Sequence, residues 1–216
     1  MLKAENLTRR YGEGERSNAV INQLNLEMLP GEFIAVTGPS GAGKSTLLSL
    51  MSGLDKPDEG SVWFQDIKVS SLTPKALAKV RNQYFGFVFQ TPHYISYKSV
   101  LENVMLPFQY QQEISHQRAL RIASELLEYV GIGELAQREP ATLSGGELQR
   151  MVFARAVVNQ PKVIFADEPT GSLDADNSRR ILDLLADQAA QGNIVMMVTH
   201  DQDAALKAQR QLELKK

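Results

Sequence analysis

Short apolar segments alternate with polar and glycine-rich stretches along most of this chain. Leu24, Leu26 and Met28 alternate with Asn25 and Glu27, which predicts a half-buried strand. Residues 33–37 predict a buried strand, and other short apolar runs predict further strands. These runs cover residues 33–37, 62–64, 85–89, 163–166 and 194–198, and a last predicted strand ends just before Lys216.

Helical patterns lie between these predicted strands. Residues 44–51 predict a helix that Gly53 ends, and residues 179–190 predict another. The stretch 91–160 is mostly helical in pattern, with apolar residues at helical spacing before Gly131: Ala119, Ala123, Leu126 or Leu127, and Val130. Strands that alternate with helices predict an α/β fold with a parallel sheet. In such sheets, ligands bind outside the carboxyl ends of the strands.

Composition restricts the class of protein. The chain has 216 residues, which suits one domain, and 43 % of them are hydrophobic. Its 23 basic and 25 acidic residues give a net charge of −2, so we expect no nucleic-acid partner. There is no cysteine, which fits a reducing compartment. The run at 194–198 is far too short to cross a bilayer, and residues 1–6 do not resemble a signal peptide. We therefore expect a chain that stays in the cytoplasm.

The stretch after the strand at 33–37 matches the phosphate-binding pattern G-x-x-x-x-G-K-[ST]. Its glycines let backbone N–H groups turn toward phosphate oxygens, and the following helix adds its positive end. Lys44 supplies a cation for the β and γ phosphates, and the Ser45 hydroxyl is a ligand for Mg²⁺. The alternative is a glycine-rich surface turn. We predict that ATP is bound by Gly38, Pro39, Ser40, Gly41, Ala42, Gly43, Lys44, Ser45 and Thr46.

Polar residues follow three other predicted strands. Asp167 and Glu168 end the strand at 163–166, where Asp167 is placed to hold Mg²⁺ and Glu168 to polarise the attacking water. Without a nearby phosphate site, this pair would simply open a loop. His200 and Gln90 follow strands in the same way, and Gln90 is a candidate ligand for Mg²⁺ or water. A lone histidine is more often structural, and a terminal glutamine is more often a polar edge residue.

Leu143–Glu147 has the sequence LSGGE and opens a predicted helix. Ser144 and Glu147 form a capping-box pattern, which by itself explains these two residues. Gly145 and Gly146 do not suit that explanation alone, because glycine costs a helix interior up to about 1 kcal/mol relative to alanine. Two adjacent glycines indicate that a group approaches the backbone closely, as a phosphate at a helix N-terminus does.

With these motifs in this order, the chain resembles the ABC transporter ATPase family from about Met1 to Leu214. The resemblance implies a P-loop NTPase core with a mostly parallel sheet, an antiparallel β subdomain and an inserted α-helical subdomain. It implies one ABC ATPase domain over 1–216, with a nucleotide-binding core at 1–90 and 161–216 and the helical subdomain at 91–160. The expected cofactors are ATP and Mg²⁺, and the expected reaction is ATP hydrolysis.

The resemblance also assigns roles to single residues. The segment 143–147 becomes the signature motif, in which Ser144, Gly145, Gly146 and Glu147 complete the ATP site of a second subunit. This implies a head-to-tail homodimer with ATP between the subunits. Tyr11 matches the aromatic residue that stacks on adenine, and Ser172–Asp174 matches the loop linking the two sites. Gln90, Glu168 and His200 match the family's catalytic positions.

Further sequence segments are similar to one branch of the family, which contains lipoprotein-releasing, macrolide-efflux and cell-division ATPases. They include residues 53–57, 81–82, 86–90, 102–107 and 165–174. Leu148 departs from the branch, which more often has a polar or charged residue after the signature Glu. The resemblance offers no regulatory C-terminal domain, so we expect none. The branch implies a peripheral place on the cytoplasmic face of the inner membrane.

The resemblance places an integral membrane permease subunit near residues 91–97. Exposed aromatic residues beside a mobile loop suit a helix-in-groove contact. Alternatively, Tyr94, Ile95 and Tyr97 pack the helical segment against the core. Three functions remain open: the ATPase of a transporter or mechanotransmitter, a nucleotide-switched scaffold of a membrane complex, and a soluble ABC ATPase. The cargo should not be encoded in this chain.

Overall fold

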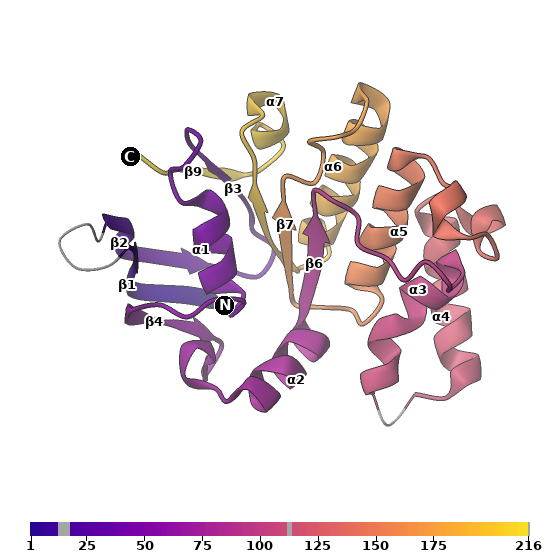
Figure 1. Ribbon diagram of the computed structural model, residues 1–216, viewed down its shortest axis with the longest axis horizontal. Helices are drawn as coiled ribbons and strands as arrows, with labels where there is room; N and C mark the ends of the chain where they lie inside the picture. The colour runs from indigo at the N-terminus through magenta and orange to yellow at the C-terminus, as the bar shows by residue number, and fades with distance from the viewer. Residues whose placement is uncertain (13–17, 112–113, 216) are drawn as a thin grey trace.

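A five-stranded parallel sheet lies at the centre of the computed structural model, which describes residues 1–12, 18–111 and 114–215 (Figure 1). Its strands run in the order β6-β7-β8-β3-β9. Every neighbouring pair is parallel, which confirms the predicted sheet. The strands are β3 (Phe33–Thr37), β6 (Phe85–Phe89), β7 (Val163–Asp167), β8 (Ile194–Val198) and β9 (Arg210–Glu213).

A second, antiparallel sheet lies beside the N-terminal half of the core. It has the order β2-β1-β4-β5, with β1 (Leu2–Tyr11), β2 (Asn18–Met28), β4 (Glu59–Phe64) and β5 (Ile67–Lys68). The strand β1 was not predicted. Its pairing with β2 changes register between Ala4 and Leu7, and again between Leu7 and Arg9. These irregularities remove the strict alternation that reveals a strand in sequence.

The helices cover the sheets on several sides (Figure 1). They are α1 (Lys44–Met51), α2 (Pro74–Tyr84), α3 (Val100–Met105), α4 (His116–Tyr129), α5 (Gly145–Val157), α6 (Ala175–Ala190) and α7 (Gln202–Ala205). Helix α6 begins four residues before its predicted start. The Asp174 carboxylate accepts a hydrogen bond from the Asn177 backbone N–H, and this cap fixes the helix start.

Two separate hydrophobic cores lie on opposite faces of the parallel sheet. Because side chains alternate along a strand, Ile34 and Val36 pack with α1 and the antiparallel sheet. Phe33 and Ala35 point the other way and belong to a core shared with α3, α4, α5 and α6. The phosphate loop and the helical stretch 91–160 are therefore supported by different cores.

Candidate nucleotide site

The loop between β3 and α1 has the geometry of a phosphate-binding loop. Gly38 and Gly43 have φ values of 141° and 92°, which L side chains rarely adopt. Lys44 is the first residue of α1, and its Nζ donates to the carbonyls of Gly38 at 2.9 Å and Pro39 at 3.2 Å. The ammonium group thus lies over the loop. Together with the helix N-terminus, it forms a site for an anion.

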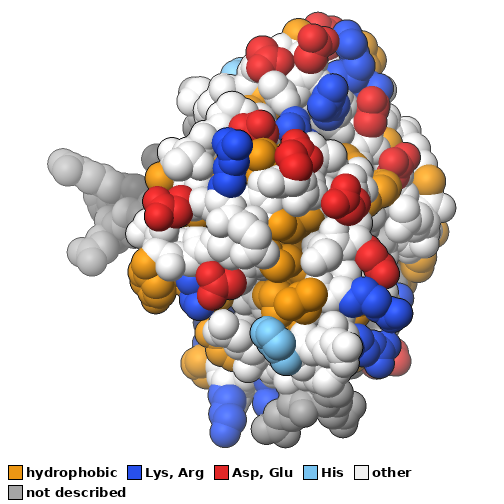
Figure 2. Space-filling view, turned by 90° about the vertical axis from the view of Figure 1, so that its right-hand side faces the viewer, with side chains coloured by type: hydrophobic (Ala, Val, Ile, Leu, Met, Phe, Trp, Pro, Cys, Tyr) orange, Lys and Arg blue, Asp and Glu red, His pale blue; other side chains and the backbone are white. Residues whose placement is uncertain are grey.

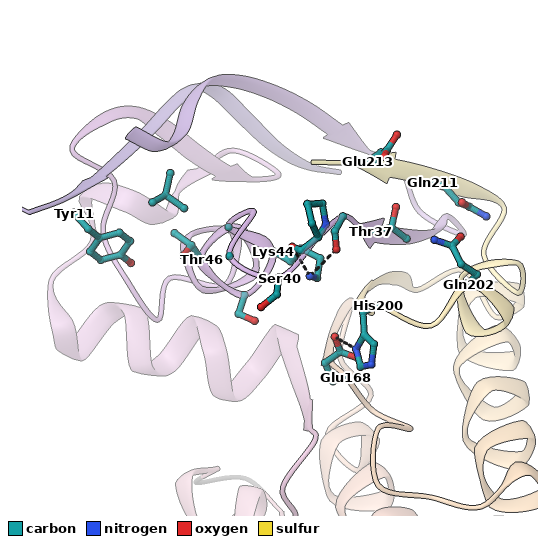
Figure 3. A pocket seen from close by; sticks show the side chains of 16 residues that line it. Tyr11, Thr37, Ser40, Lys44, Thr46, Glu168, His200, Gln202, Gln211 and Glu213 are labelled. Atoms are coloured by element: carbon teal, nitrogen blue, oxygen red, sulfur yellow. Dashed lines mark hydrogen bonds and ion pairs between the residues drawn. The ribbon is translucent and has the colours of Figure 1, made fainter. Parts of the chain in front are cut away.

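This loop forms one wall of a cleft of about 1280 Å³ (Figure 3). Eleven of the predicted site residues line it: Tyr11, Gly38, Pro39, Ser40, Gly41, Gly43, Lys44, Ser45, Thr46, Glu168 and His200. Ala42 does not, because its side chain is buried in the core beneath the loop. Tyr11 lies at one end of the cleft, and its ring also meets the Arg9 guanidinium at 5.0 Å. The cleft spans from this aromatic ring to the carboxyl ends of β7 and β8.

Five lining residues were not predicted: Val20, Thr37, Gln202, Gln211 and Glu213. Gln211 and Glu213 lie on the edge strand β9, at alternate positions that face the same side. A prediction that β9 runs parallel to β3 would have placed them at this end of the cleft. Val20 carried no chemical signal in the sequence.

Asp167 does not line the cleft itself, but it is bonded to Ser45, which does. The Ser45 Oγ donates to Asp167 Oδ1 at 3.1 Å, although the residues are 122 positions apart. Burial raises the pKa of the Asp167 carboxyl, as does the charge of Glu168, while the bond from Ser45 opposes the shift. Among the described residues, no group of three or more His, Cys, Asp or Glu could hold a metal ion. A hydroxyl and one carboxylate suit Mg²⁺, which keeps several waters and binds substrate phosphates.

Glu168 is held in place by the end of β8. Its Oε1 lies 2.8 Å from His200 Nδ1 (Figure 3), and its Oε2 accepts a hydrogen bond from the Thr199 hydroxyl at 3.4 Å. Its backbone N–H donates to the Val198 carbonyl. The residue has a φ of 47°, a conformation that is uncommon outside glycine and that aims the carboxylate at the cleft. The side chain of His200 is 70 % exposed, so its ring can face the cleft while it orients Glu168.

Gln90 does not line the cleft. Phe89 pairs with Asp167 across β6 and β7, so Gln90 and Glu168 follow neighbouring strand ends. The Gln90 side chain lies against the loop after Glu168, where a Cβ on Gly171 would come within 2.8 Å of its Nε2. The predicted contact of Gln90 with Mg²⁺ or water remains a prediction.

The signature residues lie away from the cleft of their own chain, as the resemblance implied. The Ser144 hydroxyl caps α5 by accepting from the Glu147 N–H, and Glu147 accepts from the Ser144 N–H at 2.7 Å. The Glu147 carboxylate also accepts from the Ser144 hydroxyl at 2.7 Å, and this bond and the one from the Ser144 N–H lower its pKa. A side chain on Gly146 would overlap Asn177 of α6, so an internal contact requires this glycine. At Gly145, a Cβ would meet only Leu173 at 3.9 Å among the described residues, so this glycine faces open space.

The predicted docking segment at 91–97 has no regular secondary structure. Tyr97 is 85 % exposed, while Tyr94 is partly buried and packs against the helical core. Packing against the core therefore holds for Tyr94, while docking of a membrane subunit at this segment remains a prediction. Figure 2 shows apolar side chains gathered on the face formed by the helical stretch, among charged side chains of both signs.

Comparisons with known proteins agree with this geometry. The family model described as "ABC transporter" matches residues 21–171. The chain is 41 % identical over its full length to the lipoprotein-releasing system ATP-binding protein LolD of Psychrobacter arcticus, of which it covers 96 %. It is 41 % identical over 99 % of its length to the macrolide export ATP-binding/permease protein MacB of Marinobacter nauticus. It spans only 33 % of that longer protein.

A solved structure has the same fold. The dimeric ATP-binding cassette MJ0796, bound to ADP and Pi in a post-hydrolysis state, superposes with a TM-score of 0.90. It is 39 % identical in sequence, and the match covers all of this chain and 94 % of the other. The chain therefore belongs to the ABC transporter family of ATPases, which bind ATP with Mg²⁺.

Proposed function

We propose that this chain is the ATP-hydrolysing subunit of a transporter or mechanotransmitter in the branch of lipoprotein-releasing and macrolide-export systems. One observation carries the catalytic part of this proposal. The Glu168 carboxylate, fixed by His200 and Thr199, lies beside the Ser45–Asp167 pair in the cleft that the phosphate loop lines. A candidate general base, a pair of candidate Mg²⁺ ligands and an anion site therefore lie close together.

In this proposal, each group has one task in hydrolysis. The N–H groups of the phosphate loop and the Lys44 ammonium bind the β and γ phosphates. Ser45 and Asp167 would hold Mg²⁺, which would supply positive charge to the phosphate oxygens. Glu168 accepts a proton from the water whose oxygen bonds to the γ-phosphorus, while the bond to the β–γ bridging oxygen breaks and ADP leaves. His200 orients Glu168, and Gln90 contacts Mg²⁺ or the water.

We further propose that two chains close head to tail on two ATP molecules. Ser144 and Gly145 lie outside the cleft of their own chain, and the open space at Gly145 suits the approach of a phosphate to the start of α5. Asp174 caps α6 beside this helix and belongs to the loop between the sites. The solved MJ0796 cassette is itself dimeric, which supports this arrangement.

We assign residues 1–90 and 161–216 to the nucleotide-binding core and 91–160 to a helical subdomain that receives a membrane permease. No helix in the described part of the chain has the length and apolar character needed to cross a membrane. In the proposal, the subunit binds peripherally to the cytoplasmic face of the inner membrane through the segment near 91–97. The exposed Tyr97 supports this placement.

The substitution Glu168→Gln tests the catalytic assignment. It removes the base but keeps the size of the side chain, so we expect turnover to fall by about 100-fold or more. Binding of Mg·ATP should persist, because Glu168 holds no phosphate, and ATP should then trap a dimer that light scattering detects. The exposed Glu27→Gln on β2 is the matched control and should hydrolyse ATP normally. Normal hydrolysis by the Glu168→Gln protein would refute the assignment.

A further inference from the structure

Gln149 joins two loops that are far apart in the sequence. It lies in the second turn of α5 and is only 1 % exposed. Its Nε2 donates to the carbonyl of Phe89 and to the carbonyl of Pro169, each at 2.9 Å. Because both partners can only accept hydrogen bonds, the orientation of the amide is fixed. Its Oε1 is buried without a hydrogen-bond partner in the described part of the chain.

The two carbonyls flank the catalytic loops. Phe89 immediately precedes Gln90, and Pro169 immediately follows Glu168. Since β6 and β7 are neighbours in the sheet, one buried amide bridges the backbones that leave both strands. Hydrogen bonds are strong in a buried site that excludes water. Loss of the Gln149 amide would leave the Phe89 and Pro169 carbonyls without this donor.

The same helix reaches two further elements. Ser144 and Gly145 stand at its start, one turn before Gln149. Beside Gln149, the Arg150 guanidinium donates to Asn177 Oδ1 at 2.6 Å, and the Asn177 amide donates to Asp174. The first two turns of α5 therefore hold the signature residues at one end. They also bond the backbone next to Gln90 and Glu168 directly, and they reach Asp174 through Asn177 of α6.

We propose that Gln149 is a positioning residue that sets Gln90 and Glu168 relative to each other and to the signature end of α5. The proposal rests on the proposed function for the roles of Gln90 and Glu168. Gln149 does not line the nucleotide cleft, so its loss acts on the chemical step and not on ATP binding. It acts through backbone position, where displacements of about 1 Å cost about 100-fold in rate.

The test is Gln149→Leu in the full chain, with kcat and the Kd for Mg·ATP measured separately. We expect kcat to fall about 10- to 100-fold while Kd stays within about threefold. Gln188→Leu is the matched control, because Gln188 is also buried and its amide also bonds, but on α6 away from the cleft. It should keep its kcat. If both variants lose kcat together, or Gln149→Leu keeps kcat within twofold, Gln149 has no positioning role.

A second measurement does not depend on catalysis. Amide hydrogen exchange without nucleotide should be faster at residues 90–95 and 170–173 in Gln149→Leu and unchanged there in Gln188→Leu. Gln149→Glu keeps the size but loses the donor when ionised, and it should show the same increase even if the leucine variant folds poorly. Unchanged exchange in either segment would overturn the inference. A wild-type chain without ATPase activity would refute the proposed function instead, while the exchange result would still decide the role of Gln149.

Discussion

At the scale of single residues, Asp167 is subject to opposing influences. Burial raises the pKa of its carboxyl above the ordinary 3.8, and the nearby Glu168 charge adds to this rise, whereas Ser45 and Lys44 oppose it. A raised carboxyl pKa means that the folded protein holds the proton more tightly than the unfolded chain does. Ionised Asp167 therefore costs stability as pH rises from about 3.8 through its folded pKa. In the proposed function, Mg²⁺ bound by Asp167 would offset that cost.

We predict that Asp167→Asn stabilises the nucleotide-free protein at pH 7, because it removes a buried carboxylate and retains an oxygen that accepts from Ser45. Tm should rise by about 1–3 °C, a modest gain because the group is partly screened by solvent. The gain should vanish near pH 3, where the wild-type carboxyl is protonated, and Mg·ATP should no longer raise Tm. The exposed Asp66→Asn should change neither value. A Tm below that of the wild type at pH 7 would contradict the prediction.

Chemical identity in the sequence was enough to find lining residues that belong to a motif, such as Lys44 and Glu168, but not the charged Glu213 on β9. It could not find Val20 or Gln202, because an ordinary side chain gains a place in a site only through tertiary position. Gln149 shows the same limit. A glutamine inside a helix carries no signal until its two distant carbonyl partners are brought together.

At the scale of elements, the start of α5 contains two adjacent glycines, Gly145 and Gly146, that serve different purposes. The capping box predicted from Ser144 and Glu147 is present. The close approach inferred from the glycine pair is an internal one at Gly146, where Asn177 packs against the backbone. At Gly145, a chemical partner from outside the chain is the proposed explanation.

We therefore expect Gly145→Ala and Gly146→Ala to separate folding from activity. Gly146→Ala should lower the free energy of unfolding by about 1–3 kcal/mol, because the methyl group overlaps Asn177. Gly145→Ala should change it by less than about 0.5 kcal/mol, since its methyl group has room, yet reduce ATP turnover at least about tenfold by blocking the partner's phosphate. Chemical denaturation and a steady-state ATPase assay measure both quantities. Equal losses of stability in the two variants would contradict this division.

At the scale of the whole molecule, the parallel sheet was predictable because four of its five strands are short, apolar and mostly buried, although the edge strand β9 is polar. The antiparallel sheet was only partly visible, since β1 carries register shifts and many polar residues. The relative placement of α5 and α6 was not predictable, because it depends on contacts such as Arg150 with Asn177.

In the proposed function, the whole molecule also binds a membrane protein. The tagged chain, extracted in mild detergent, should co-purify with an integral membrane protein, and Tyr97→Ala should weaken that recovery several-fold while ATP binding persists. Tyr110→Ala, at another highly exposed tyrosine, is the control. A partner with few spans and a large extracytoplasmic domain would indicate a mechanotransmitter, and a six-span permease a conventional transporter. If no membrane protein is recovered even with ATP and Glu168→Gln, the proposed coupling is wrong.

The division of the apolar interior by the parallel sheet has an evolutionary consequence. In the proposed arrangement, mutations in α3 and α4 that suit a new membrane protein would alter one core only, whereas the phosphate loop rests on the other. Lineages could therefore change their membrane partner, and with it the cargo, while the nucleotide site is inherited unchanged. The same partition recommends residues 91–143 as the unit to exchange when chimeric cassettes are built.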